Sequence, residues 1–289
     1  MLFNFLKKKF RMSSLFIVAT PIGNLEDITL RALRVLKEVD LIAAEDTRHT
    51  RKLLTHFGIK TPLSSYHAHN QKTRGPELIQ RLQNGQNIAL VSDAGTPGFS
   101  DPGADLAALA WDAGIKVEAV PGPAAGVAAL SMSGFKGDVT FVGFLPTREG
   151  KRRELLSRLA NEPRVVIIYL SPRRLLPTLE EIAAVMGNRR VLVVRELTKK
   201  FEEAWRGPVG EIAEELAGRE IKGECALVLS CPEGEPAREV NLTEHLLKTS
   251  RESRLQGRQL TDLVAGGLKL PRRQVYQAYL ALKAQGRVK

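Results

Sequence analysis

The sequence predicts an α/β fold, with two α/β domains followed by a small helical C-terminal appendage. Short apolar runs alternate with longer segments of helical spacing through most of the chain, which is typical of a mainly parallel, doubly wound sheet. The 289 residues, 43% of them hydrophobic, are enough for two domains with cores of their own. From residue 236 onward the strand-like runs stop and only helical spacings remain.

The expected elements of the first domain follow one another in strict alternation. Strands are expected at residues 15–19, 41–44, 62–66, 88–91 and 116–120. Helices are expected at 28–39 (capped by Asp27), at 50–57 (closed by Gly58), at 76–83 (opened by Pro76), at 104–111 and after residue 126. Residues 67–75, between the third strand and the helix at 76–83, are expected to form a polar loop.

A change in composition at residues 134–139 predicts the boundary between a first domain, 12–134, and a second, 135–235. Phe141 and Phe144, just after it, are expected in the core. The second domain is expected to hold strands at 164–170, 191–197 and 225–230, an antiparallel strand at 202–207, and helices near 151–160, 173–186 and 208–217.

The tail, residues 236–289, is expected to hold three helices, marked by Leu242, Leu246 and Leu247, by Leu260, Leu263 and Val264, and by Val275, Tyr279 and Leu282. The last two are joined by a turn that contains glycine, and basic residues lie at the start of the last one, as in a helix-turn-helix. A helical cap packed on the body is the alternative.

The net charge of +11 is concentrated at the two ends of the chain. Residues 1–11 form an expected basic, flexible extension with four basic and no acidic side chains, and residues 236–289 carry eleven basic and four acidic ones. The body between them is balanced at 28 against 28. Basic ends on a neutral body favour a polyanionic partner, although a basic tail that only aids solubility fits the same charges.

The remaining composition indicates a cytoplasmic protein. No apolar run approaches the ~20 residues that a membrane span needs. Cys225 and Cys231 are too few for a disulfide framework or a zinc site, so both are expected to be reduced thiols. His67 and His69 have a spacing that suits a metal, but no third ligand matches it, and no metal is expected.

Two loops rich in glycine and proline each follow an expected strand and precede a helix: residues 92–103 and 121–126. In an open α/β sheet such loops lie at the carboxyl ends of the strands, where ligands bind. Neither loop carries a GK[ST] phosphate cradle, and no GxGxxG follows the first strand. The pair therefore predicts a site for a ligand that is not strongly anionic, where Asp93 accepts hydrogen bonds from it or only caps a turn.

Five motifs occur in a fixed order: Val18–Thr29 (VATPIGNLEDIT), Ala44–Thr50 (AEDTRHT), Ser92–Pro97 (SDAGTP), Val120–Ala124 (VPGPA) and Phe141–Pro146 (FVGFLP). Together they closely resemble the family of bacterial 16S rRNA (cytidine) 2′-O-ribose methyltransferase I, in the tetrapyrrole (precorrin) methylase superfamily. The resemblance covers residues 15–235, and the tail is similar too. Where tetrapyrrole enzymes have Gly-Asp-Pro, this chain has Ser92-Asp-Ala, which points to the rRNA branch.

The resemblance implies a homodimer with S-adenosylmethionine (SAM) in the cleft between the two α/β domains. It implies transfer of a methyl group to a cytidine ribose in the decoding region of 16S rRNA in the small ribosomal subunit. The implied cofactor-binding residues are Ile22, Gly23, Asp93, Gly95, Thr96, Ala124, Ala125, Leu170 and Ala226.

The reaction requires no metal, because a sulfonium methyl group is already electrophilic. Orienting the ribose hydroxyl supplies ~7–11 kcal/mol, and a general base adds roughly 10²–10⁴-fold in rate. Candidate bases are Glu45, Asp46, Lys151 and His67. For Glu45 and Asp46, pairing with Arg48 or capping of the next helix is the alternative role.

RNA contacts are expected from Arg48, His67, Asn70, Arg152, Arg153, Lys269, Arg272 and Arg273, and Tyr66 is a candidate for stacking on a base. Two other functions remain open from the sequence: a tetrapyrrole (precorrin-type) methyltransferase, and a non-enzymatic DNA-binding regulator with a ligand-sensing α/β body. The basic tail and the missing Gly-Asp-Pro argue against the first.

Overall fold

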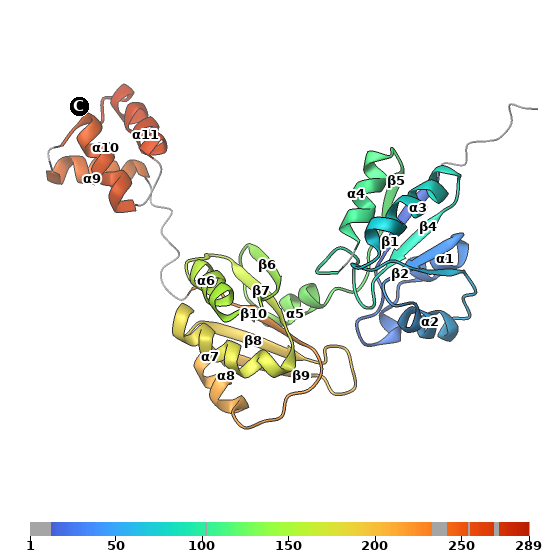
Figure 1. Cartoon of the computed structure of the whole chain (residues 1–289). Coiled ribbons are helices and arrows are strands. Elements are labelled where there is room, and N and C mark those ends of the chain that lie inside the picture. The colour runs from blue at the N-terminus through green and yellow to red at the C-terminus, as the bar shows by residue number, and fades with distance from the viewer. Residues whose placement is uncertain (1–12, 102, 233–241, 254, 269–271, 289) are drawn as a thin grey trace, which may run out of the picture. The chain divides into compact units, whose positions relative to one another are not determined.

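The computed structural model (Figure 1) describes residues 13–101, 103–232, 242–253, 255–268 and 272–288. The chain divides after residue 231 into two compact units. The first unit contains two five-stranded sheets, and the second contains the tail helices. The predicted α/β class with a helical appendage is confirmed, while the predicted domain limits at 134 and 235 stay predictions. In the described part of the chain, no helix has the length and apolar character needed to cross a membrane.

The first sheet is entirely parallel, as the alternating pattern predicts. Its strand order is β3-β2-β4-β1-β5. All five expected strands are present: β1 (Ser14–Val18), β2 (Leu41–Ala44), β3 (Leu63–Ser65), β4 (Ile88–Val91) and β5 (Lys116–Val120). β2 and β4 are buried along their whole length, which explains their unbroken apolar sequences.

Helices cover both faces of this sheet, so it is doubly wound. α1 (Leu30–Glu38) and α2 (Thr47–His56) enclose one core cluster, and α3 (Gln71–Gln83) and α4 (Ala104–Asp112) enclose the other. Each cluster is built from aliphatic side chains at helical spacing set against alternate strand residues.

Three helix starts differ from the prediction. The Thr29 hydroxyl caps α1 by accepting the Ala32 N–H at 3.0 Å, and Asp27 ends a short 3₁₀ turn (Leu25–Asp27) instead. α2 begins at Thr47 because the Asp46 carboxylate accepts the Arg48 N–H at 2.8 Å. α3 begins at Gln71, so Pro76 lies inside it rather than at its start. The fixed φ of proline suits a helix, and near the N-terminus its missing N–H costs one hydrogen bond.

The second sheet is mixed, with strand order β6-β7-β10-β8-β9. β6 pairs with β7 in parallel and every other pair is antiparallel, including the predicted antiparallel strand β9. The strands are β6 (Val139–Phe144), β7 (Val165–Leu170), β8 (Arg190–Arg195), β9 (Glu203–Pro208) and β10 (Cys225–Leu229). β6 was not expected from the sequence, because two glycine-rich stretches flank it.

Three helices pack on one face of this sheet: α6 (Glu149–Leu159), α7 (Leu175–Met186, preceded by the 3₁₀ turn Pro172–Arg174) and α8 (Val209–Leu216). α5 (Ala125–Ser133) packs on the other face, where Ala129 contacts the core residues of β7, β8 and β10. α5 directly follows β5 in the chain. The loop between them therefore carries the backbone from one sheet to the other.

The tail forms α9 (Leu242–Ser253), α10 (Gly257–Leu268) and α11 (Arg272–Ala284), as the sequence predicts. Leu246, Leu260, Val264, Val275 and Tyr279 share one buried cluster, so the tail has a core of its own. Leu263, which marked the second helix in the sequence, lies outside this cluster, and half of its surface is exposed.

Candidate active site

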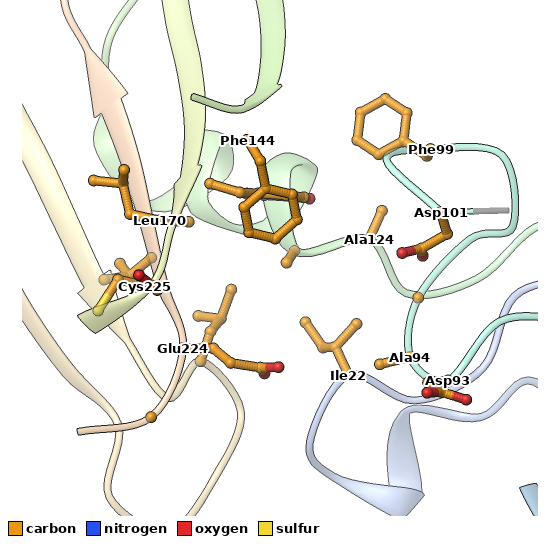
Figure 2. A pocket seen from close by; sticks show the side chains of 18 of the residues that line it. Ile22, Asp93, Ala94, Phe99, Asp101, Ala124, Phe144, Leu170, Glu224 and Cys225 are labelled. Atoms are coloured by element: carbon orange, nitrogen blue, oxygen red, sulfur yellow. The ribbon is translucent and has the colours of Figure 1, made fainter. Parts of the chain in front are cut away.

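A cavity of about 460 Å³ is lined by residues from both sheets of the first unit (Figure 2). This volume is within the range of small-molecule sites. One side consists of the loops at the carboxyl ends of β1, β2 and β4 and the loop before α5. The other side consists of the end of β7, the start of β10 and the residues that follow β8. The loops that follow the parallel strands β1, β2 and β4 lie together at the carboxyl ends of these strands, as predicted for the first sheet.

The structure brings most of the predicted cofactor-binding residues to this cavity. Its lining includes Ile22, Asp93, Gly95, Thr96, Ala124, Ala125, Leu170 and Ala226. Gly23 is not in the lining; a Cβ atom there would lie 2.5 Å from Lys199 Cγ, so Gly23 permits a close approach of two loops. The roles of all nine residues in binding a cofactor stay predictions.

The loop after β4 is tied to its neighbours by backbone hydrogen bonds. Thr20 N–H donates to Gly95 O at 2.8 Å and Gly95 N–H donates to Thr20 O at 2.9 Å. The Thr96 hydroxyl donates to Pro123 O at 3.1 Å. Gly95 has φ +81°, a conformation that side-chain-bearing residues rarely adopt. Three loops thus form one rigid wall, and glycine at 95 is required by the backbone.

Four carboxylates line the cavity, those of Glu45, Asp93, Asp101 and Glu224. Among the residues that the structure describes, no lysine, arginine or histidine belongs to the lining. Burial raises the pKa of Glu45. Burial, reinforced by repulsion from Glu45, raises the pKa of Asp101 to about 6. A site of this composition disfavours anions and stabilises a positively charged ligand.

Asp46 does not belong to this group of cavity carboxylates and has a structural role instead. Its carboxylate caps α2 and pairs with Arg48, with Arg48 Nη2 2.7 Å from Asp46 Oδ2. Hydrogen bonds from Arg48 hold the pKa of Asp46 far below its ordinary value. Asp46 is absent from the cavity lining, as is Lys151, which lies exposed on α6. Of the predicted bases, only Glu45 lines the cavity; His67 lies close enough to lower the pKa of Glu45.

An aromatic group completes one wall of the cavity. Phe99 stacks on Phe141 with centroids 3.9 Å apart, and Tyr169 meets Phe141 and Phe144 edge to face at 5.3 and 5.6 Å. The Tyr169 hydroxyl accepts the Gly126 N–H at 2.7 Å. The prediction that Phe144 belongs to the core is wrong, because 63% of its surface is exposed at the cavity.

Sequence reasoning missed several lining residues, namely Phe99, Asp101, Tyr169, Ser171, Pro172, Glu224 and Cys225. Phe99 and Asp101 lie inside the glycine- and proline-rich stretch already singled out, so that stretch held the signal. For Tyr169 and Glu224 there was none, because only the pairing of β7 with β10 brings them to the cavity.

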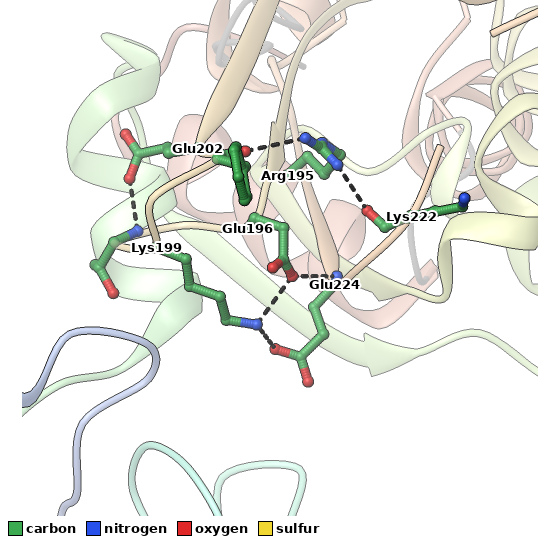
Figure 3. A network of polar contacts seen from close by, with 8 residues as sticks. Arg195, Glu196, Lys199, Glu202, Lys222 and Glu224 are labelled. Atoms are coloured by element: carbon green, nitrogen blue, oxygen red, sulfur yellow. Dashed lines mark hydrogen bonds and ion pairs between the residues drawn. The ribbon is translucent and has the colours of Figure 1, made fainter. Parts of the chain in front are cut away.

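A network of ion pairs fixes the loop that follows β8 (Figure 3). Lys199 Nζ lies 2.9 Å from Glu196 Oε1 and 3.0 Å from Glu224 Oε2. Glu196 Oε1 also accepts the Glu224 N–H at 2.9 Å. Glu196 and Thr198 have positive φ, at 51° and 66°. The network offsets this backbone strain and holds Leu197 and Glu224 in the cavity wall.

The predicted RNA-binding residues of the first sheet have partners of their own. Arg48 is exposed but paired with Asp46. The Asn70 side chain accepts the His67 N–H at 2.8 Å and donates to Ser65. Tyr66 is 1% exposed, so the prediction that it stacks on an RNA base is wrong.

Further along the chain, Arg152 Nε lies 2.6 Å from Glu181 Oε2 in a largely buried ion pair, whereas Arg153 is exposed. In the tail, Arg272 and Arg273 are exposed, and Arg272 Nε lies 3.3 Å from Asp262 Oδ1. Lys269 lies outside the described residues. Within the described ranges no three metal-ligating side chains gather, and Cys225 and Cys231 are free thiols.

Comparison with known proteins shows the class of enzyme to which the chain belongs. A family model described as Tetrapyrrole (Corrin/Porphyrin) Methylases matches residues 14–213. The fold agrees: a uroporphyrin-III C-methyltransferase from Thermus thermophilus superposes with a TM-score of 0.55 at 21% identity, over 75% of this chain and 94% of that one. The two sheets and the cavity are thus those of a methyltransferase of the tetrapyrrole methylase type.

The chain belongs to the ribosomal RNA small subunit methyltransferase I family within this class. It is 49% identical to the Synechocystis sp. protein of that name over 280 residues, which are 95% of this chain and 100% of the relative. It is 50% identical to the Escherichia coli O157:H7 protein, over 81% and 82% of the two chains. The Streptococcus pyogenes serotype M1 protein is 40% identical, over 94% and 96%. The non-enzymatic regulator is thereby excluded.

Proposed function

We propose that this methyltransferase uses SAM to methylate the ribose 2′-hydroxyl of a cytidine in the decoding region of 16S rRNA. The observation that carries the choice of SAM is the charge of the cavity. Of the described residues, four carboxylates and no basic side chain line it, and SAM has a sulfonium and an ammonium group. These charges are complementary, whereas a phosphorylated ligand would meet repulsion.

The opposite side of the cavity suits the adenosine part. Leu170, Val194, Leu197 and Ala226 provide an apolar surface, and the small side chains of Ala124 and Ala125 leave room beside it. Bound there, SAM would supply an electrophilic methyl group, and the protein would supply position and a proton acceptor. Orientation of the two reactants accounts for ~7–11 kcal/mol of the barrier.

The choice of rRNA rather than a tetrapyrrole is supported by the relatives, whose names state small-subunit ribosomal RNA and which are 40–50% identical. The solved tetrapyrrole enzyme from Thermus thermophilus shares only the fold, at 21% identity. We place the RNA contacts on Arg48, His67, Asn70, Arg153 and the basic tail. A homodimer working in the cytoplasm, where ribosomal subunits are found, belongs to the same proposal.

The direct test uses small ribosomal subunits from cells that lack the modification, incubated with the protein and methyl-labelled SAM. Label is expected in 16S rRNA, on the ribose of one cytidine, as read by nuclease digestion and mass spectrometry. Label on a base, or no label, would refute the assignment. Free tetrapyrrole offered under the same conditions is the control and is expected to remain unlabelled.

A further inference from the structure

Helix α2 has a buried side and an exposed side of opposite character. Thr50, Leu53 and Leu54 are its buried residues, and Leu54 belongs to the core cluster that α2 shares with α1. The 3.6-residue period of a helix turns the other side toward solvent. That side carries Arg48, His49, Arg51, Lys52, Thr55 and His56, all of them exposed. The sequence from Thr47 to His56 has no acidic residue, so the exposed side has positive charge and no negative charge.

Three cations of this side, Arg48, Arg51 and Lys52, form the basic face of α2. The Arg48 side chain pairs with Asp46 and is nevertheless 88% exposed. Neither Arg51 nor Lys52 has an ion pair or a side-chain hydrogen bond with any residue that the structure describes. An incoming anion could therefore bind these two side chains without breaking an existing contact.

The basic face does not serve the stability of α2. Arg51 and Lys52 lie three and four residues after Arg48, and side chains at both spacings are neighbours on a helix. Like charges at these spacings are unfavourable. On α1, which packs on the same core cluster, the equivalent spacing holds a stabilising pair instead, with Arg34 Nη1 3.0 Å from Glu38 Oε2. Cations that do not help their own helix indicate a role in binding.

The basic face lies beside the cavity. Glu45, which lines the cavity, and Asp46, which caps α2, directly precede the helix. The Asp46 N–H donates to Asp93 Oδ1 at 2.9 Å, which ties the start of α2 to a second lining residue. With a helix rise of ~1.5 Å per residue, Lys52 is about 8 Å along the axis from the first residue of α2. Positive charge thus stands outside a cavity that is lined by carboxylates.

We infer that the basic face of α2 binds backbone phosphates of the rRNA strand beside the cytidine that is methylated. The inference rests on the proposed function and adds an RNA-binding surface to it. Phosphates repeat along an RNA strand, so cations that follow one another along a helix can each neutralise one. The guanidinium of an arginine also matches the geometry of a phosphate.

The two charge patterns then act together on one strand. Carboxylates inside the cavity repel the phosphates and attract the cationic cofactor. The basic face holds the phosphates outside. An uncharged ribose hydroxyl is the part of the nucleotide that meets repulsion from neither, so it can approach the methyl group of SAM.

Lys37 and Lys60 provide a matched control at the other edge of the sheet. Both are exposed, and neither has an ion pair with a residue in the described ranges. Lys37 is in the last turn of α1, just before β2, and Lys60 precedes β3. Both therefore lie near the amino ends of parallel strands, whereas the cavity is at the carboxyl ends.

The experiment compares the wild type with two double variants, Arg51→Ala/Lys52→Ala and Arg51→Glu/Lys52→Glu. Lys37 and Lys60 are changed in the same two ways, so that net charge changes equally. Binding to small ribosomal subunits that lack the modification is measured from about 50 to 200 mM salt. Methyl transfer gives KM and kcat, calorimetry gives SAM affinity, thermal unfolding gives the midpoint, and sedimentation gives the oligomeric state.

Arg51→Ala/Lys52→Ala is expected to bind the subunits about 5–30-fold more weakly, because two exposed ion pairs are lost. The slope of log affinity against log salt should fall by about 2, one for each phosphate contact. KM for the subunits should rise, while kcat and SAM affinity stay at wild-type values, because both residues lie outside the cavity lining. The variants of Lys37 and Lys60 should match the wild type within about twofold.

Arg51→Glu/Lys52→Glu separates binding from stability. It is expected to bind the subunits more weakly than the alanine pair, because acidic side chains repel phosphates. Its unfolding midpoint should equal or exceed that of the wild type, because repulsion from Arg48 is replaced by attraction. A residue that only supports the fold would not lose rRNA affinity while keeping its stability.

Three results would overturn the inference while the wild type still labels ribose. One is unchanged affinity and salt slope in both α2 variants. Another is an equal loss in the variants of Lys37 and Lys60, which would assign the effect to net charge. The third is an altered oligomeric state with unchanged rRNA affinity, which would assign the basic face to contacts between copies of the chain. Failure of the wild type to label ribose would instead refute the proposed function, and the inference with it.

Discussion

Replacing Arg152 or Arg153 with alanine separates a structural arginine from one free to bind RNA, although the two are adjacent in sequence. Arg152 pairs with Glu181 at 2.6 Å, and the side chains are 17% and 14% exposed. Breaking a buried pair costs ~3–5 kcal/mol, and breaking an exposed one costs ~0–1 kcal/mol. A pair this little exposed lies between these limits, so Arg152→Ala is expected to lose about 2 kcal/mol.

In a unit of this size, 1 kcal/mol shifts the unfolding midpoint by ~2–4 °C. Arg152→Ala is therefore expected to lower the midpoint, measured by circular dichroism or calorimetry, by roughly 4–8 °C. Arg153→Ala removes an exposed side chain and is expected to stay within about 1 °C of the wild type. Its effect should appear in rRNA binding instead, where the salt slope falls by about 1.

A double variant, Arg152→Met with Glu181→Leu, controls for lost packing. Replacing both partners with apolar side chains leaves no buried charge, so its midpoint is expected to recover toward the wild-type value. The reasoning is refuted if Arg152→Ala unfolds at the wild-type temperature, or if Arg153→Ala proves the less stable of the two.

Three further outcomes are expected. Asp93→Ala removes the acceptor of the Asp46 N–H and a cavity carboxylate, so calorimetry should show SAM affinity about 10–100-fold weaker; unaltered affinity would mean that this loop has another purpose. Burial raises the pKa of Cys225 to about 11, so this thiol stays protonated at pH 8. Iodoacetamide should therefore modify Cys231 well before Cys225, as read by peptide mass spectrometry, and equal rates for the two cysteines would contradict this. Deleting residues 236–289 should weaken rRNA binding and flatten its salt dependence, because the deletion removes basic side chains. SAM binding should persist, because the tail has a core of its own. An rRNA affinity equal to that of the full chain would exclude a docking role.

The first sheet was the most predictable part of the molecule. β2 and β4 are buried on both faces, so their sequences are continuous apolar runs that leave little alternative to a strand. Helix starts were less predictable, because Asp27, Thr29 and Asp46 are all plausible caps. Thr29 accepts a backbone N–H at the start of α1 and Asp46 accepts one at the start of α2, whereas Asp27 ends a 3₁₀ turn.

For the site, the amino-acid sequence was enough to predict the two loops and the absence of a phosphate cradle. Both depend on local residues: glycine where φ is positive, as at Gly95, and no Walker lysine. It did not distinguish the roles of Glu45 and Asp46, which are neighbours in the chain. The folded chain is needed to show that Glu45 lines the cavity and that Asp46 caps α2. The same holds for Asp101, whose proton affinity depends on burial and on carboxylates brought to it from other loops and from the second sheet. Electrostatic interactions act through space, so a sequence can name the ionisable groups, while their protonation and their roles follow from the fold.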